Sequence, residues 1–289
     1  MSIADLIEIQ ASILEPRNEH RNRQTSFQLK SCRGQQTPPT KKRGDITLST
    51  ALIGTSGYSY DHWMGPFYPR GLARSKWLPH YAKHLFTVEI NYSFYHLPSH
   101  KTLENWAERT PVPFRFALKA SRGITHRGSP DRSGRLVKIF AERVRILGSK
   151  MGPILYQFPG RLDYDLTMLE RFLALLPNDI RSAIEFRSDA WATDEVFQLL
   201  RRYGVGYCIA SAPGLSCHLK TTARFAYIRM HGISSWYTYK YTESDLRWWG
   251  DRIGELLDRG CDVYVYFNND YRGYAPSNAL RLKQLLEKS

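Results

Sequence analysis

Polar side chains end an apolar segment of the chain at residues 261–270, CDVYVYFNND. The β-branched and aromatic residues predict a buried strand, and Asn268, Asn269 and Asp270 follow at its carboxyl end. Asn and Asp are common in turns, so one such segment predicts either a turn or a functional site. The pattern recurs on other apolar segments, which favours a site. Those segments end in Glu89 and Asn91, Lys119, Gln157, Glu185 and Arg187, and Arg229 and His231.

Five of these residues are candidates for acid/base catalysis: Glu89, Lys119, Glu185, His231 and Asp270. A carboxylate such as Glu185 or Glu89 beside Lys119 would support proton transfer, because burial and close opposite charges shift both pKa values. A hydrogen-bonded structural histidine is the alternative interpretation of His231.

The remaining polar and aromatic residues have the chemistry to bind a phosphorylated or sugar-like small molecule. Arg187 and Arg229 can each hold an oxyanion through two N–H groups. Side-chain amides can pair with hydroxyls, and aromatic rings offer flat faces to a sugar or a base. The amide candidates are Asn91, Gln157, Asn268 and Asn269, and the aromatic candidates are Tyr95, Trp191 and Tyr237. A strand-end salt bridge is the alternative for any single Arg or Glu.

A divalent metal is the competing interpretation of the same residues. Glu89, Glu185 and Asp270 with His231 are oxygen and nitrogen ligands of a suitable kind, but their spacing matches no metal motif. Three cations from Lys119, Arg187 and Arg229 would repel a metal ion unless a bound phosphate lay between them. We therefore expect no metal and no cofactor.

Eight apolar segments could position these side chains as strands. They span residues 47–56, 87–93, 114–121, 152–159, 181–187, 204–210, 224–232 and 261–269. Residues two apart on a strand point to the same face, so Glu89 with Asn91, Glu185 with Arg187, and Arg229 with His231 can each enter one site together.

Helical periodicity between the strands completes a repeating unit. Apolar residues recur at helical spacing within 137–147, 169–176 and 246–257. Strands and helices that alternate in this way predict a closed parallel (β/α)₈ barrel of the triosephosphate-isomerase type, whose active sites lie at the carboxyl ends of the strands. A doubly wound open sheet is the alternative, but GTSGYSYDHW after the first strand is no Gly-rich nucleotide-binding turn. The segment SAPGLSCHLKTTA (211–223) is too short for a full sixth helix, which we expect to be degenerate or missing.

Several motifs in order resemble the YecE-like family, a domain of unknown function. They include GTSGYSYDHW, EINYSFYHLP, YQFP, IEFRSDAW, RMHG, YTYKYTESDLRWW and VYVYFNND, within about residues 53–286. The resemblance implies a barrel with a polar pocket at its mouth and no established reaction. Its pocket positions match Glu89, Asn91, Tyr95, Lys119, Gln157, Glu185, Arg187, Trp191, Arg229, His231 and Asn268. Where family members often carry an acidic residue at the end of the sixth strand, this chain has Ala210 and Ser211, so a role that needs that carboxylate is in doubt.

The composition of the chain leaves a second partner class open. With 41 Lys and Arg against 27 Asp and Glu, its formal net charge is +14, which favours polyanions and phosphate esters. The basic loops 121–135 and 234–241 support a nucleic-acid-binding or nucleic-acid-processing protein as the alternative function. No oligonucleotide-binding signature accompanies them.

The N-terminal residues 1–46 are expected to be a disordered or weakly ordered extension to a single barrel domain at 47–289, because they contain few large apolar residues. No segment is apolar enough to span a membrane, and no secretion signal precedes the barrel. Four scattered cysteines without CxxC spacing suit a reducing cytoplasm. The oligomeric state does not follow from the sequence.

Overall fold

A computed structural model describes residues 49–127 and 129–287. The prediction of a disordered extension at residues 1–46 falls outside these ranges. The eight predicted strands lie inside them, apart from residues 47 and 48 of the first.

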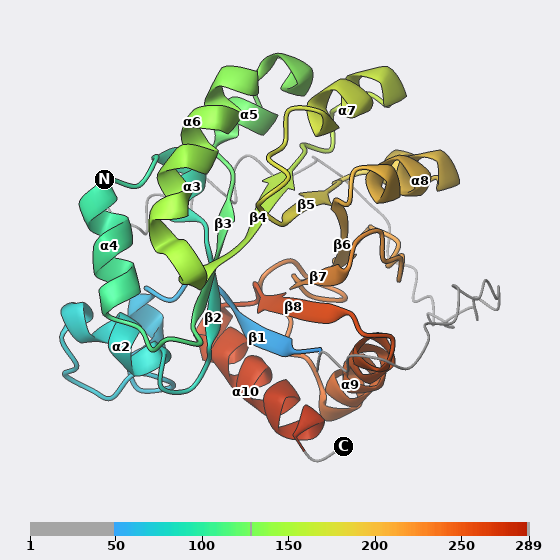
Figure 1. Cartoon of the computed structure of the whole chain (residues 1–289). Helices are drawn as coiled ribbons and strands as arrows, with labels where there is room; N and C mark the ends of the chain where they lie inside the picture. The colour runs from blue at the N-terminus through green and yellow to red at the C-terminus, as the bar shows by residue number, and fades with distance from the viewer. Residues whose placement is uncertain (1–48, 128, 288–289) are drawn as a thin grey trace, which may run out of the picture. The chain divides into compact units, whose positions relative to one another are not determined.

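The sheet is a closed parallel barrel in the order β1 to β8, and Figure 1 shows its strands ringed by helices. This confirms the predicted (β/α)₈ fold over the open sheet. β8 pairs with β1 through five residue pairs from Ala51–Val263 to Thr55–Phe267, which closes the ring. The strands are β1 Ala51–Ser56, β2 Thr87–Ile90, β3 Arg115–Lys119, β4 Met151–Gln157, β5 Ser182–Glu185, β6 Gly206–Ser211, β7 Phe225–Met230 and β8 Asp262–Phe267.

Helices connect the strands in every unit but one. The α-helices are α2 Trp77–Tyr81, α3 Tyr92–Tyr95, α4 His100–Glu108, α5 Arg122–Thr125, α6 Gly134–Val144, α7 Leu166–Leu173, α8 Asp194–Arg202, α9 Glu243–Asp258 and α10 Tyr274–Leu286. Short 3₁₀ turns are η1 Asp61–Trp63, η2 Arg74–Lys76, η3 Pro130–Arg132, η4 Arg145–Lys150, η5 Asp189–Trp191 and η6 Tyr271–Gly273. Residues 212–224, all of them described, contain no helix between β6 and β7. The sixth helix is therefore missing, as predicted.

Local sequence signals account for the helix ends. Thr242 and Asp245 form a capping box at the start of α9, where each side chain accepts from the other residue's backbone N–H. Thr193 accepts from the N–H of Val196 and caps α8. Gly204 follows α8 with a φ of 65° and Gly260 follows α9 with a φ of 73°, a left-handed conformation that glycine adopts without strain. These signals end α8 and α9 a few residues before β6 and β8 begin.

The barrel interior is filled by a layer of side chains separate from the outer core. This inner layer contains two tyrosines, Tyr227 and Tyr266, that are wholly buried with ring centroids 5.1 Å apart. Its members are Ala117, Leu155, Ala183, Cys208, Phe225, Tyr227, Tyr264 and Tyr266. Because side chains alternate along a strand, the residue two positions further on faces the barrel mouth. On five strands that residue is a candidate of the sequence analysis: Lys119, Gln157, Glu185, Arg229 and Asn268.

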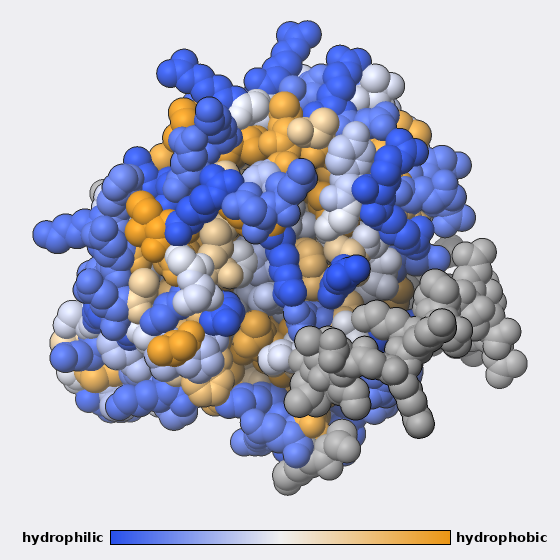
Figure 2. Space-filling view, in the orientation of Figure 1, coloured by the Kyte–Doolittle hydropathy of each residue, from blue (hydrophilic) through white to orange (hydrophobic). Residues whose placement is uncertain are grey.

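The outer surface is polar. Figure 2 shows hydrophilic side chains projecting over the face in view, with apolar patches between them. No helix within the described ranges is long and apolar enough to cross a membrane.

Candidate functional site

Arg229 lies at the centre of a buried network in the barrel mouth. Its Nη1 donates to Glu185 Oε2 at 2.5 Å, and its Nη2 donates to Glu89 Oε1 at 2.7 Å. Arg229 is 1% exposed and both carboxylates are fully buried. One guanidinium therefore bridges carboxylates from β2 and β5, and holds three strands in a fixed relation.

Glu89 has all its hydrogen bonds inside the protein. Ser56 donates to the same oxygen as Arg229, and Tyr227 donates to the other oxygen at 2.7 Å. Asn91 donates in turn to Ser56 at 2.8 Å, while its own side-chain oxygen is buried without a partner among the described residues. Glu89 is thus fixed in place, and the Asn91 oxygen is a buried acceptor without a partner among the described residues.

Glu185 is surrounded by positive charge. Its Oε1 lies 2.9 Å from Arg187 Nε, although that N–H is not aimed at the oxygen, and 3.0 Å from His231 Nε2. Burial alone raises the pKa of a carboxyl group, but Arg187, Arg229 and the bond from His231 outweigh it and hold the pKa of Glu185 well below its usual range. Glu185 is therefore ionised at neutral pH.

His231 is neutral in this setting. Burial and the two arginines lower its pKa from 6.5 to about 3. Asn268 Nδ2 lies 3.1 Å from His231 Nδ1, so Nδ1 accepts from the amide and Nε2 carries the proton that it donates to Glu185. His231 thus links β8 to β5 as a hydrogen-bonded residue, and its titration falls far below neutral pH.

Lys119 differs from the other charged residues of the mouth because it has no polar partner. Its side chain is 5% exposed, and Nζ lies 4.1 Å from the centroid of the Phe94 ring. Among the described residues, Nζ makes no ion pair and donates no hydrogen bond. Burial, followed by repulsion from Arg229, lowers the pKa of Lys119 from 10.5 to about 7, although Glu185 and Glu89 partly oppose the change. A large fraction of the amine is unprotonated at neutral pH.

A group of basic residues borders the mouth beside Lys119. Burial and the charges of Lys119, Arg161, Arg122 and Arg187 lower the pKa of His126 from 6.5 to about 4. Arg122 and Arg161 form no ion pair with a carboxylate in the described part of the chain. Positive charge is therefore uncompensated on the side of the mouth formed by the loops after β3 and β4.

Aromatic residues cover another side of the mouth. The Trp236 ring lies 4.7 Å from the Arg187 guanidinium and 5.2 Å from the His231 ring. Tyr237 lies 5.9 Å from His231 and has a φ of 63°, which is unusual for a residue with a side chain. Tyr95 is partly buried near Arg122 and Tyr237, and burial raises its pKa. Gln157 is 8% exposed and makes no side-chain hydrogen bond with a described residue.

Two candidates of the sequence analysis, Asn269 and Trp191, make their contacts away from the Arg229 network. Asn269 donates to the Tyr239 carbonyl at 2.7 Å and to Asn278 at 2.9 Å, so it ties β8 to neighbouring segments. Trp191 is 1% exposed and stacks on Phe186 with centroids 4.9 Å apart, which leaves no free face for a ligand. The contacts of these two residues in this structure are therefore with other parts of the fold.

Asp270 lies at the edge of the mouth, toward η1. Its Oδ2 is 3.5 Å from His62 Nε2, and its carbonyl accepts from His62 and from Trp63 Nε1. Burial raises the pKa of Asp270. The structure thus places it in a separate pair with His62, apart from Glu89 and Glu185.

Some residues of the mouth were not found from the sequence. Tyr227 precedes Arg229 by two positions, so strand alternation alone could have indicated it. Ser56 ends β1, and Arg122 and Arg161 follow the ends of β3 and β4 closely. Trp236 lies in the irregular loop between β7 and α9, which the sequence analysis names only as a basic loop that could bind nucleic acid.

No three His, Cys, Asp or Glu side chains among residues 49–127 and 129–287 form a group able to hold a metal ion. The ligand atoms of Glu89 and Glu185 already accept hydrogen bonds from Arg229. Arg229 thus already occupies one oxygen of each carboxylate, and its positive charge would repel a cation placed beside them.

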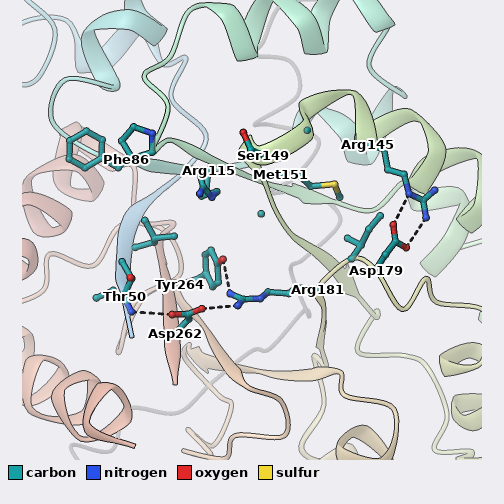
Figure 3. A pocket seen from close by; sticks show the side chains of 16 residues that line it. Thr50, Phe86, Arg115, Arg145, Ser149, Met151, Asp179, Arg181, Asp262 and Tyr264 are labelled. Atoms are coloured by element: carbon teal, nitrogen blue, oxygen red, sulfur yellow. Dashed lines mark hydrogen bonds and ion pairs between the residues drawn. The ribbon is translucent and has the colours of Figure 1, made fainter. Parts of the chain in front are cut away.

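A cavity of about 810 Å³ lies at the opposite, amino-terminal end of the strands. Figure 3 shows that two of its three arginines face nearby carboxylates: Arg181 pairs with Asp262 at 2.7 Å, and Arg145 binds Asp179 through two hydrogen bonds. These pairs neutralise much of its charge. Although the cavity is large, its groups are exposed or paired, so we place the candidate site at the mouth.

Comparisons with known proteins agree with the fold. A family model described as "Protein of unknown function DUF72" matches residues 52–289. The UPF0759 protein YunF of Bacillus subtilis is 26% identical over 268 residues, which cover 81% of this chain and 94% of YunF. The UPF0759 protein YecE of Escherichia coli is 32% identical over 127 residues, 43% of this chain and 47% of YecE.

Solved structures give the same result. A crystal structure of a DUF72 family protein from Thermotoga maritima has a TM-score of 0.75 at 28% identity and covers 82% of this chain and 99% of its own. A second, from Enterococcus faecalis, has a TM-score of 0.72 at 22% identity, covers 83% and 96%, and supports the fold. The resemblance to the YecE-like family is thus confirmed, and the chain belongs to the DUF72 family.

Proposed function

We propose that the barrel mouth binds a phosphorylated or sugar-like small molecule and transforms it by acid/base chemistry. The observation that carries the proposal is the buried, unpartnered amine of Lys119, whose pKa is lowered to about 7. A general base works best when its pKa lies near the working pH. Burying a lysine without a partner destabilises the fold, and such local costs are characteristic of functional sites.

The two carboxylates have a different role in this proposal. Glu185 is a weak base because its pKa is held well below the usual range, and Glu89 already accepts three hydrogen bonds. The sequence analysis predicts that a carboxylate acts with Lys119 in proton transfer. The geometry instead supports Glu185 and Glu89 as fixed negative charges, oriented by Arg229, that favour positive charge developing on the substrate or on Lys119.

The ligand class follows from the groups that lack partners. Arg122 and Arg161 can receive a phosphate beside Lys119, because no carboxylate neutralises them in the described ranges. The Gln157 amide, which makes no side-chain hydrogen bond with a described residue, can pair with a ligand hydroxyl. Trp236 and Tyr237 offer apolar surface to a sugar ring.

A melting-temperature panel at fixed ionic strength tests the proposal. Ribose 5-phosphate, fructose 6-phosphate, ribose and inorganic phosphate are compared with short single-stranded DNA and RNA. A ligand at a hundred times its dissociation constant adds about 2.7 kcal/mol of stability, and we expect this from a sugar phosphate. The shift should disappear in Arg122→Gln and persist in the control Arg201→Gln, which alters an exposed residue of α8.

Two outcomes would contradict the proposal. Equal shifts with ribose and ribose 5-phosphate would remove the role of the basic residues. Stabilisation by oligonucleotides alone, falling steeply as salt is raised, would favour the nucleic-acid alternative suggested by the net charge of +14.

A further inference from the structure

The amine of Lys119 lies at the barrel mouth and has no hydrogen-bond or ion-pair partner among the described residues. It lies at the carboxyl end of β3, with its side chain turned to the mouth two positions beyond the inner-layer residue Ala117. Nζ contacts the Phe94 ring at 4.1 Å from the centroid and makes no polar contact with a described residue. Nζ also keeps some contact with solvent, unlike the Asn91 side-chain oxygen, which is fully buried. Its lone pair is thus free to attack a ligand.

We propose that Lys119 forms an imine with the carbonyl carbon of an aldehyde or ketone that carries a phosphate or another anionic group. This inference rests on the proposed function, because the same mouth must first bind the anionic part of the molecule. It adds the class of reacting group and a covalent role for Lys119.

The reaction balances without any further reagent. The Nζ lone pair attacks the carbonyl carbon, a C–N bond forms, and the C=O electron pair moves to oxygen, which takes up a proton from the nitrogen. The second amine hydrogen and the hydroxyl then leave as water, and a C=N bond remains. No oxidant or reductant takes part, and a lysine amine of lowered pKa is the usual nucleophile for this step.

The surroundings of Lys119 suit such an intermediate. When the imine is protonated, its positive charge lies within the field of Glu89 and Glu185, both of which already act on Lys119. Arg122, Arg161 and Arg187 border the same side of the mouth and can hold the anionic group. The Phe94 face limits water around the C–N bond, which slows hydrolysis of the imine.

Reductive trapping on the full chain tests the inference. The protein is incubated at pH 7 with glyceraldehyde 3-phosphate or with glyceraldehyde, each with sodium cyanoborohydride, and the modified lysines are identified by peptide mass spectrometry. We expect saturable labelling of Lys119 by the phosphorylated aldehyde, at least about tenfold faster than labelling of the exposed Lys138, since about half of the Lys119 amine is unprotonated at this pH. Inorganic phosphate should slow it.

Controls separate the two proposals. Lys119→Met should lose the adduct and keep a cooperative melting transition. If glyceraldehyde 3-phosphate raises the melting temperature but labels Lys119 no faster than Lys138, the imine is refuted and the binding site stands. If it neither stabilises the protein nor labels Lys119, and the sugar phosphates also leave the melting temperature unchanged, the proposed function fails as well. Equal labelling of Lys119 by both aldehydes would overturn the anionic requirement.

Discussion

Replacing Lys119 with methionine should stabilise the protein at neutral pH. The change removes a buried cation whose only close partner among the described residues is the Phe94 ring, and it leaves a side chain of similar shape. A pKa of about 7 in place of 10.5 means that the folded environment disfavours the charged form by roughly 5 kcal/mol, at about 1.4 kcal/mol for each pH unit. We take this as an upper bound, because water or a small shift of the amine reduces the cost.

The gain should depend on pH in a defined direction. Between pH 7 and 10.5 the unfolded chain holds a proton on Lys119 that the folded chain has largely lost, so the parent protein becomes more stable as the pH rises. Below pH 7 the full cost of the buried charge is present, and above 10.5 none of it remains. The advantage of Lys119→Met is therefore largest at pH 6 to 7 and declines toward pH 10.

Urea denaturation of parent and variant at pH 6, 7, 8, 9 and 10 measures this difference directly. Taking the difference cancels all other groups that titrate alike in the two proteins. Lys138→Met, at an exposed position of α6, serves as a control with an expected effect within about 0.5 kcal/mol at each pH. A Lys119→Met variant that is less stable than the parent at pH 7, or whose advantage does not change with pH, would refute the reasoning about the amine.

Other changes test the network and the barrel. Arg229→Met should cost at least 3 to 5 kcal/mol in urea denaturation, because two buried carboxylates lose their partner, whereas Arg74→Met, at an exposed ion pair, should cost less than about 1 kcal/mol. Similar losses for both would be inconsistent with the network. His126 has a pKa of about 4 in place of 6.5, so between these pH values the unfolded chain binds more protons and the parent protein loses stability on acidification. In His126→Gln that loss should be smaller. An unchanged dependence of the unfolding free energy on pH would contradict the lowered pKa of His126. Gly54→Ala should prevent folding or cost several kcal/mol, since its Cβ would lie 2.0 Å from the Thr87 carbonyl oxygen, while Gly254→Ala, with open space in α9, should add about 0.4 to 1 kcal/mol. If Gly54→Ala were as stable as Gly254→Ala, β1 and β2 would be less closely packed than the contact between Gly54 and Thr87 indicates.

The sequence was sufficient for the fold because each signal was local. Apolar runs located all eight strands, and the short segment after Ser211 predicted the missing helix. Alternation along strands also placed Lys119, Glu185 and Arg229 at one end of the barrel.

Side-chain contacts between distant segments could not be predicted from local sequence signals. Asn269 follows Asn268 directly, yet it turns to Tyr239 and Asn278, and this depends on how the loop after β7 packs. Trp191 matched a motif of the resembling family, but stacking on Phe186 decides its environment. The lack of a partner for Lys119 likewise became evident only when Arg229 was seen to occupy both carboxylates.

The inner layer of Tyr227, Tyr266 and their neighbours closes the barrel below the mouth network. These side chains fill the barrel between the mouth network and the cavity at the amino-terminal end of the strands, so the two ends are not joined through the barrel. If the mouth carries out the proposed reaction, the product must leave by the side through which the substrate entered, and so must the water molecule released on forming the imine. A slowly departing product would then block the next substrate, so product inhibition should be competitive with substrate in steady-state kinetics.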